Sequence, residues 1–244
     1  MTAPAPTPAR KRAAAATPPA TNPSPAAITR IVVRPIATPI SLGFLGLAAA
    51  TFVVSGLQLG WISPLQKPFV GLILMSFTAM LQLVATVYGF LSRDSVAATG
   101  MGVLTGTWFA VGLVYYVSPA SATTSGGLGL LLLASGTALL VPVLGALETK
   151  VLAAVVLGTA AARFFVTGAY EMSGSSTWKA TAGWLGLALF FLAVLAAFAF
   201  EIEDTKRKPL AATMRRGKGK KALAGSVQDE VAHVHEEAGA RETL

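Results

Sequence analysis

The chain has 244 residues, of which 54% are apolar and only 12% are charged, and its mean hydropathy is +0.65. Because soluble domains carry charge on about a quarter of their residues, this composition excludes an ordinary soluble fold. The absence of cysteine excludes disulfides and thiol chemistry, and the net charge of +8 does not indicate nucleic-acid binding, since nearly all basic residues lie in the terminal segments.

Residues 1–33 form a low-complexity segment rich in Pro, Ala and Thr. Such a segment buries too little apolar surface to offset its ordering entropy, so we expect a disordered cytoplasmic tail. Its cluster Arg10-Lys11-Arg12 predicts attraction to anionic lipid, with a protein-binding motif as the alternative.

Six stretches of low charge have the length of a membrane-spanning helix. They cover about 40–60, 68–91, 96–117, 126–147, 151–170 and 180–200. Short links rich in Ser, Pro or Gly separate them. The sequence therefore predicts an all-α polytopic membrane protein, with a six-helix transmembrane domain over 34–204 and a basic, polar cytoplasmic tail over 205–244.

The distribution of Lys and Arg predicts the topology. If both termini are cytoplasmic, the outer links hold only Lys67 and Lys179, whereas the inner side holds both basic tails. The asymmetry comes from the tails, because the short links alone carry equal numbers. We expect a multi-pass protein of the cell membrane, with the basic residues of the second tail, Arg215 among them, on the inner leaflet.

Small residues recur at helical spacing in three of the predicted helices. Gly43 and Gly46 lie in the first, Gly102 and Gly106 in the third, and Gly183 and Gly186 in the sixth. Such spacing lets neighbouring helices approach closely in a membrane. We therefore assign Gly46, Gly102, Gly106, Gly183 and Gly186 to helix packing.

The second helix carries Gln82 near its centre. Hydrocarbon offers an amide no hydrogen-bond partner, so Gln82 must find one inside the protein. Two roles fit this position, namely lining a polar pathway and joining neighbouring helices by a hydrogen bond.

The fifth helix contains an arginine at membrane depth, Arg163. It follows Lys150 by 13 residues, or roughly 20 Å of helix, where a charge is costly and usually functional. A guanidinium offers a fork of donors that matches a carboxylate. The alternatives are that Arg163 snorkels to the outer interface or pairs with Glu171.

Several runs occur in an order that resembles the acetate uptake transporter family, also called YaaH-like. Thr38–Phe44 is similar to its opening Asn-Pro-x-Pro-Leu-Gly-Leu signature, with Pro39, Leu42 and Gly43 identical. Gly106–Phe109 is similar to its Gly-Ser-Phe-Trp run, and Ala182–Leu187 to its Ala-Gly-aromatic-x-Gly run. Gln82 and Glu201 also fall where the family has Gln and Glu. The resemblance covers about 34–209, and the tails are unmatched.

This resemblance implies a substrate pathway within each protomer. Pro39, Leu42, Gly43 and Gln82 would lie on it, together with Leu47, Thr105, Thr107 and Trp108 of the matching runs. Leu47 and Thr105 stand where the better-studied members carry aromatic residues, which implies a less aromatic constriction. Arg163 has no counterpart in the family motif, and its assignment to the pathway rests on the physical reasoning above.

The resemblance further implies uptake of acetate or a similar small carboxylate, by a channel or a proton-linked transporter. It also implies membrane lipids as partners and a homo-oligomer, which by the family resemblance is a hexamer. No catalytic residue, metal or cofactor is expected, because the predicted helices hold no His and no acid at their centre. We therefore expect no enzymatic activity and no nucleic-acid partner. The alternative is a structural or assembly subunit whose helices only pack.

Overall fold

The computed structural model describes residues 37–119, 121–206, 208, 210–217 and 219–220, which all belong to one compact unit spanning Pro35–Ser226. The predicted tail over 1–33 and most of the predicted tail from 205 onward lie outside the described residues. The packing described below concerns this unit alone.

Ten helical elements follow one another through the described residues. They are α2 (Ile40–Gln58), η1 (Pro64–Gln66), α3 (Lys67–Ile73), η2 (Leu74–Thr78), α4 (Ala79–Leu91), α5 (Ser95–Val117), α6 (Gly126–Leu147), α7 (Val151–Ser173), α8 (Ser176–Lys206) and η3 (Ala211–Thr213). The elements from η1 to α4 join into one span, Pro64–Leu91, so six spans are long and apolar enough to cross a membrane. The predicted all-α bundle of six membrane helices is confirmed.

Local sequence explains where several helices begin and end. The side chain of Asp94 accepts a hydrogen bond from the Ala97 N–H at 3.2 Å, and that of Ser125 from the Leu128 N–H at 3.3 Å. These side chains satisfy amides that the first turns of α5 and α6 leave free. Gly174 ends α7 with a positive φ of 69°, a conformation that glycine adopts without steric cost.

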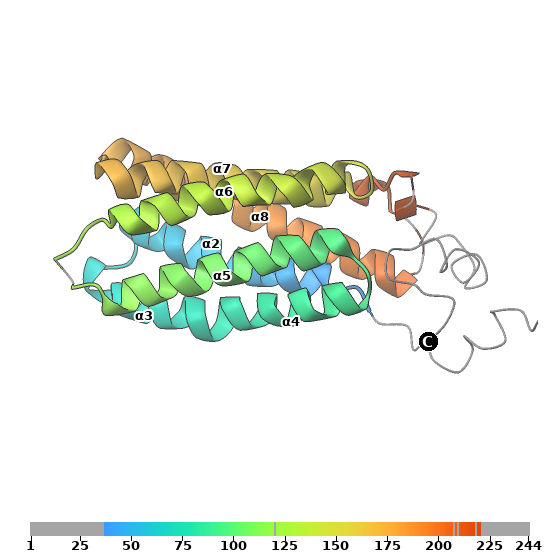
Figure 1. Ribbon diagram of the computed structural model, residues 1–244, viewed down its shortest axis with the longest axis horizontal. Coiled ribbons are helices and arrows are strands. Elements are labelled where there is room, and N and C mark those ends of the chain that lie inside the picture. Colours follow the sequence, from blue (N-terminus) through green and yellow to red (C-terminus); the bar gives the residue numbers. More distant parts are fainter. Residues whose placement is uncertain (1–36, 120, 207, 209, 218, 221–244) are drawn as a thin grey trace, which may run out of the picture. The chain divides into compact units, whose positions relative to one another are not determined.

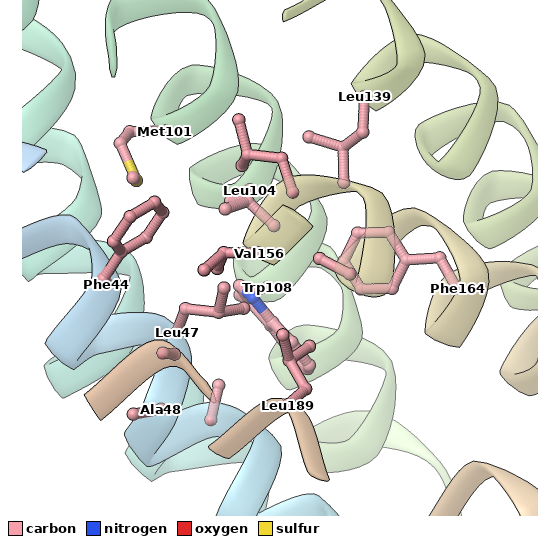
Figure 2. Close-up of a cluster of buried hydrophobic side chains, with 14 of the residues drawn as sticks. Phe44, Leu47, Ala48, Met101, Leu104, Trp108, Leu139, Val156, Phe164 and Leu189 are labelled. Carbon is pink, nitrogen blue, oxygen red and sulfur yellow. The ribbon is translucent and has the colours of Figure 1, made fainter. Parts of the chain in front are cut away.

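The spans pack as neighbouring pairs around a shared apolar core. Figure 1 shows α2 alongside α8, α6 alongside α7, and α4 alongside α5. Side chains from α2, α5, α7 and α8 converge between them in Figure 2, including Leu47, Trp108, Phe164 and Leu189. The ring of Trp108 meets that of Phe164 edge-on at a centroid distance of 5.5 Å, a favourable aromatic geometry.

Three of the five glycines assigned to packing lie tightly against another helix. A Cβ built on Gly46 would lie 3.2 Å from Gln82 Cγ of α4, and one on Gly183 would lie 2.7 Å from Leu59, just after α2. A Cβ on Gly186 would overlap side chains of α2 and α7. Only a residue without a side chain allows these approaches.

The two glycines of α5 differ from that expectation. A Cβ on Gly102 would make an ordinary contact of 3.4 Å with Thr86 of α4. A Cβ on Gly106 would meet nothing within 4 Å among the described residues, and Gly106 is exposed. The expected packing at Gly106 is therefore not found, because this position of α5 faces away from α4, α6 and the core.

Two ion pairs among the described residues stabilise the end of the bundle where α8 ends. Glu203 is fully buried and accepts hydrogen bonds from Arg215 Nε at 2.6 Å, Thr213 Oγ1 at 2.7 Å and the Leu210 N–H at 3.1 Å. At the same end Lys150, which precedes α7, pairs with Asp94. Arg215, which was expected on the inner leaflet, has a side chain that is only 9% exposed and folds back onto Glu203.

Replacing Glu203 by alanine is expected to lower the free energy of unfolding by about 3 kcal/mol, since it leaves the guanidinium of Arg215 buried without its partner. The midpoint of thermal unfolding in detergent measures the loss. Glu201→Ala is the matched control, because Glu201 lies on the same helix and is exposed. Equal midpoints for the two variants would contradict the prediction.

Candidate functional site

A pocket lies at the end of the bundle where α2, α5 and α7 finish and α3 and α8 begin. We call it the mouth pocket. Its volume is about 80 Å³, which is room for several water molecules. It is lined by Leu57, Gln58, Pro64, Lys67, Tyr115, Ala122, Thr123, Tyr170, Glu171 and Lys179.

The mouth pocket has a net positive charge, with Lys67 and Lys179 against a single carboxylate, Glu171. Lys67 Nζ donates to the carbonyl of Ala122 at 3.1 Å, and Glu171 Oε2 accepts from the Ser125 N–H at 2.8 Å. These bonds hold the link between α5 and α6 beside the pocket. A concave site with excess positive charge raises the local concentration of anions.

Below the mouth pocket, Arg163 is buried in the bundle with 1% of its surface exposed. It precedes Glu171 by eight residues, or about 12 Å along α7. Its Nη2 donates to Gln58 Oε1 at 3.4 Å, and its Cζ lies 5.5 Å from the ring centroid of Trp108. No carboxylate within the described part of the chain forms an ion pair with it.

The two alternatives for Arg163 are therefore not supported. A snorkelling arginine would expose its guanidinium, whereas this one is buried, and the carboxylate of Glu171 is bonded to the Ser125 N–H instead. A buried cation without a counter-charge is costly to hold. Such a residue is a candidate for function inside a membrane protein.

Four buried donors on Arg163 and on residues beside it have no protein partner. They are Arg163 Nε, Gln58 Nε2, Ser55 Oγ and Trp108 Nε1. A Cβ built on Gly186 would lie within 2.6 Å of both Arg163 Nε and Ser55 Oγ, so the glycine leaves these two donors unobstructed. We call Arg163, Gln58, Ser55 and Trp108 the Arg163 cage.

Gln82 occupies a second polar position, between α4 and α2. Its side chain is fully buried, its Nε2 donates to the carbonyl of Gly43 at 3.5 Å, and its Oε1 has no partner. One turn earlier, Thr78 Oγ1 is also buried without a partner. Thr78 ends the π-helical turn η2, and such turns are frequent at functional sites. Gln82 is not among the described residues that line the mouth pocket.

Two threonines proposed for the pathway use their hydroxyl groups elsewhere. Thr105 Oγ1 donates to the Met101 carbonyl of its own helix at 2.8 Å. Thr107 Oγ1 lies 2.7 Å from the Val103 carbonyl and 2.8 Å from Ser135 Oγ of α6. Thr107 therefore joins α5 to α6.

The remaining predicted positions lie in or before α2. Pro39 is buried immediately before the helix, and Leu42 is partly buried in its first turn. A Cβ on Gly43 would overlap Met101 of α5, and Leu47 is fully buried in the core. Gly43 therefore allows α2 to approach α5 closely, and none of these residues lines the mouth pocket in the described structure.

Sequence reasoning missed two members of the Arg163 cage, Ser55 and Gln58. They are three residues apart on α2, so they share one helical face. This polar pair at the end of an apolar helix was a usable signal. Lys67 and Lys179 entered the sequence reasoning only as indicators of topology, because linear sequence does not show that they face one pocket.

No known protein family matches the sequence, and no curated protein does. Among solved structures, that of the bacterial acetate channel SatP superimposes with a TM-score of 0.62 over 70% of this chain and 95% of that chain, at 17% sequence identity. The fold is that of SatP. The match confirms the fold expected from the resemblance to acetate transporters, and it covers nearly the whole length of SatP.

Proposed function

We propose that this protein is a membrane channel or transporter for acetate or a similar small carboxylate. The single observation that carries the proposal is Arg163, a buried cation without an ion-pair partner among the described residues, which Gln58 connects to a cationic mouth pocket. The shared fold with SatP, a protein described as an acetate channel, supports it. The absence of enzymatic activity stays a prediction.

A small carboxylate suits the chemistry of this arrangement. The planar guanidinium of Arg163 offers parallel donors that fit two carboxylate oxygens. The apolar residues of the adjoining core, such as Leu47 and Phe164, would accept a short hydrocarbon group. Anions concentrated by Lys67 and Lys179 would thus reach a site that suits both the carboxylate and the hydrocarbon group of the substrate.

We extend the proposal to the surroundings of the bundle. The distribution of basic residues supports a position in the cell membrane with both termini in the cytoplasm and the mouth pocket outside. The domain over 34–204 would carry the substrate, and the basic tails over 1–33 and 205–244 would contact anionic lipid. Exposed apolar side chains such as Phe69 and Phe198 would face lipid or other copies in a homo-oligomer, a hexamer by the family resemblance.

Flux of labelled acetate into liposomes tests the function. We expect faster uptake than in protein-free liposomes, competition by other short carboxylates, and no competition by an equal concentration of chloride. Adding an uncoupler separates the two mechanisms, because proton-linked accumulation would collapse whereas channel flux would persist. Uptake equal to that of protein-free liposomes would favour the alternative, a structural subunit that does not transport.

A further inference from the structure

Gln58 belongs to both parts of the candidate site. It is the last residue of α2, it is 6% exposed, and it lines the mouth pocket. Its Oε1 also accepts the hydrogen bond from Arg163 Nη2 at 3.4 Å. Gln58 is therefore placed between the mouth pocket and Arg163.

Several hydrogen-bond donors on and beside Arg163 have no acceptor in the protein. Arg163 Nε, Gln58 Nε2, Ser55 Oγ and Trp108 Nε1 are buried and unpartnered within the protein. They belong to Arg163 itself and to residues of α2 and α5 that lie beside it. Unpartnered donors beside a buried cation, without a protein carboxylate, form the kind of site that binds an anion.

The neutral oxygen of Gln58 occupies the position on Arg163 that a carboxylate oxygen would take. We propose that Gln58 is a stand-in ligand, and that an entering small carboxylate displaces its amide oxygen from the guanidinium. The inference rests on the proposed function and adds the residue that controls access to Arg163. Ser55 and Trp108 would then donate to the bound anion.

The exchange is favourable for physical reasons. A carboxylate adds a Coulomb attraction to the guanidinium that a neutral amide lacks, and it can bond the planar fork through two parallel N–H···O bonds, so the carboxylate replaces the amide. Gln58 has a flexible side chain next to the mouth pocket, whose volume is about 80 Å³, and can turn into it. Its Nε2 then remains available to donate to the substrate. Gly186 adds no side chain to obstruct the rearrangement.

Two substitutions at this position separate a stand-in ligand from a structural residue. Gln58→Glu provides a permanent carboxylate for Arg163, which an acetate ion cannot displace easily. Gln58→Leu provides no ligand at all. Gln66→Glu is the matched control, because it adds the same negative charge on an exposed residue close to the mouth end. Thermal unfolding in detergent with sodium acetate, against equal sodium chloride, measures binding, and liposome uptake measures flux.

We expect acetate to raise the unfolding midpoint of the wild type, Gln58→Leu and Gln66→Glu. Gln58→Glu is expected to unfold at a higher temperature than the wild type, to show no further shift with acetate, and to lose at least about tenfold in flux. Wild-type flux by Gln58→Glu, its aggregation, or loss of the acetate shift in Gln58→Leu would each overturn the inference. Absence of flux in the wild type would instead refute the proposed function. The shift of the unfolding midpoint by acetate would still measure binding at Arg163.

Discussion

Replacing Arg163 by glutamine is expected to reduce acetate flux by about 10- to 100-fold, because hydrogen bonds to a charged group contribute about 1.5–3 kcal/mol. The guanidinium is buried and forms no ion pair within the described residues, so its removal also removes an uncompensated charge. We therefore expect the variant to be at least as stable as the wild type. Liposome uptake and the midpoint of thermal unfolding measure the two effects.

Two further variants complete this test of Arg163. Arg163→Lys keeps the charge but not the planar fork, and we expect intermediate flux. Arg216→Gln makes the same change at an exposed position at the opposite end of the bundle and should transport as the wild type does. A structural arginine would give the opposite pattern, in which Arg163→Gln unfolds at a lower temperature but retains uptake per folded protein.

Gln82→Leu is expected to reduce acetate flux by about tenfold. The substitution removes a polar group from the pathway, and a hydrogen bond from such a group to the substrate contributes about 1–2 kcal/mol. In the structure Gln82 makes one long hydrogen bond, from Nε2 to the Gly43 carbonyl at 3.5 Å, and leaves Oε1 unpartnered. Such a residue contributes little to holding α4 against α2. Leucine has a similar size and no unpaired polar atom, so we expect the unfolding midpoint to be unchanged or higher.

Gln66→Leu is the matched control for this substitution, because Gln66 is exposed in η1. It should leave both uptake and the unfolding midpoint unchanged. If Gln82 only joins two helices, Gln82→Leu would instead lower the unfolding midpoint and keep the uptake rate of the folded protein. The two roles that the sequence left open for Gln82 thus predict opposite pairs of results.

Membrane spans could be predicted from the sequence with few errors, because each span must satisfy its own backbone hydrogen bonds and remain apolar. The predicted 126–147 helix coincides with α6. The predicted end of α8 at 200 was too early, since the helix continues to Lys206 and its buried Glu203 finds partners beyond the helix end. The π-helical turn η2 was not predicted, because the residues Leu74–Thr78 carry no Pro or Gly to mark it.

The candidate site could be predicted only in part from the sequence. Arg163 could be found as a charge within an apolar run, but Thr105 was assigned to the pathway although its hydroxyl bonds the backbone of its own helix. Family resemblance pointed to Gln82 and Trp108, yet it gave no counterpart for Arg163. The cationic mouth pocket was missed because its residues come from separate ends of several helices.

The sequence by itself determined that the chain forms six apolar helices and that one of them carries an arginine at membrane depth, since hydropathy and charge are properties of neighbouring residues. Only the tertiary structure decided that Gln58, 105 residues away in the chain, provides the oxygen that faces this arginine. Which helical faces meet depends on side-chain packing between distant segments. That packing also placed Trp108 beside the guanidinium and no carboxylate of the described chain within ion-pairing distance of it.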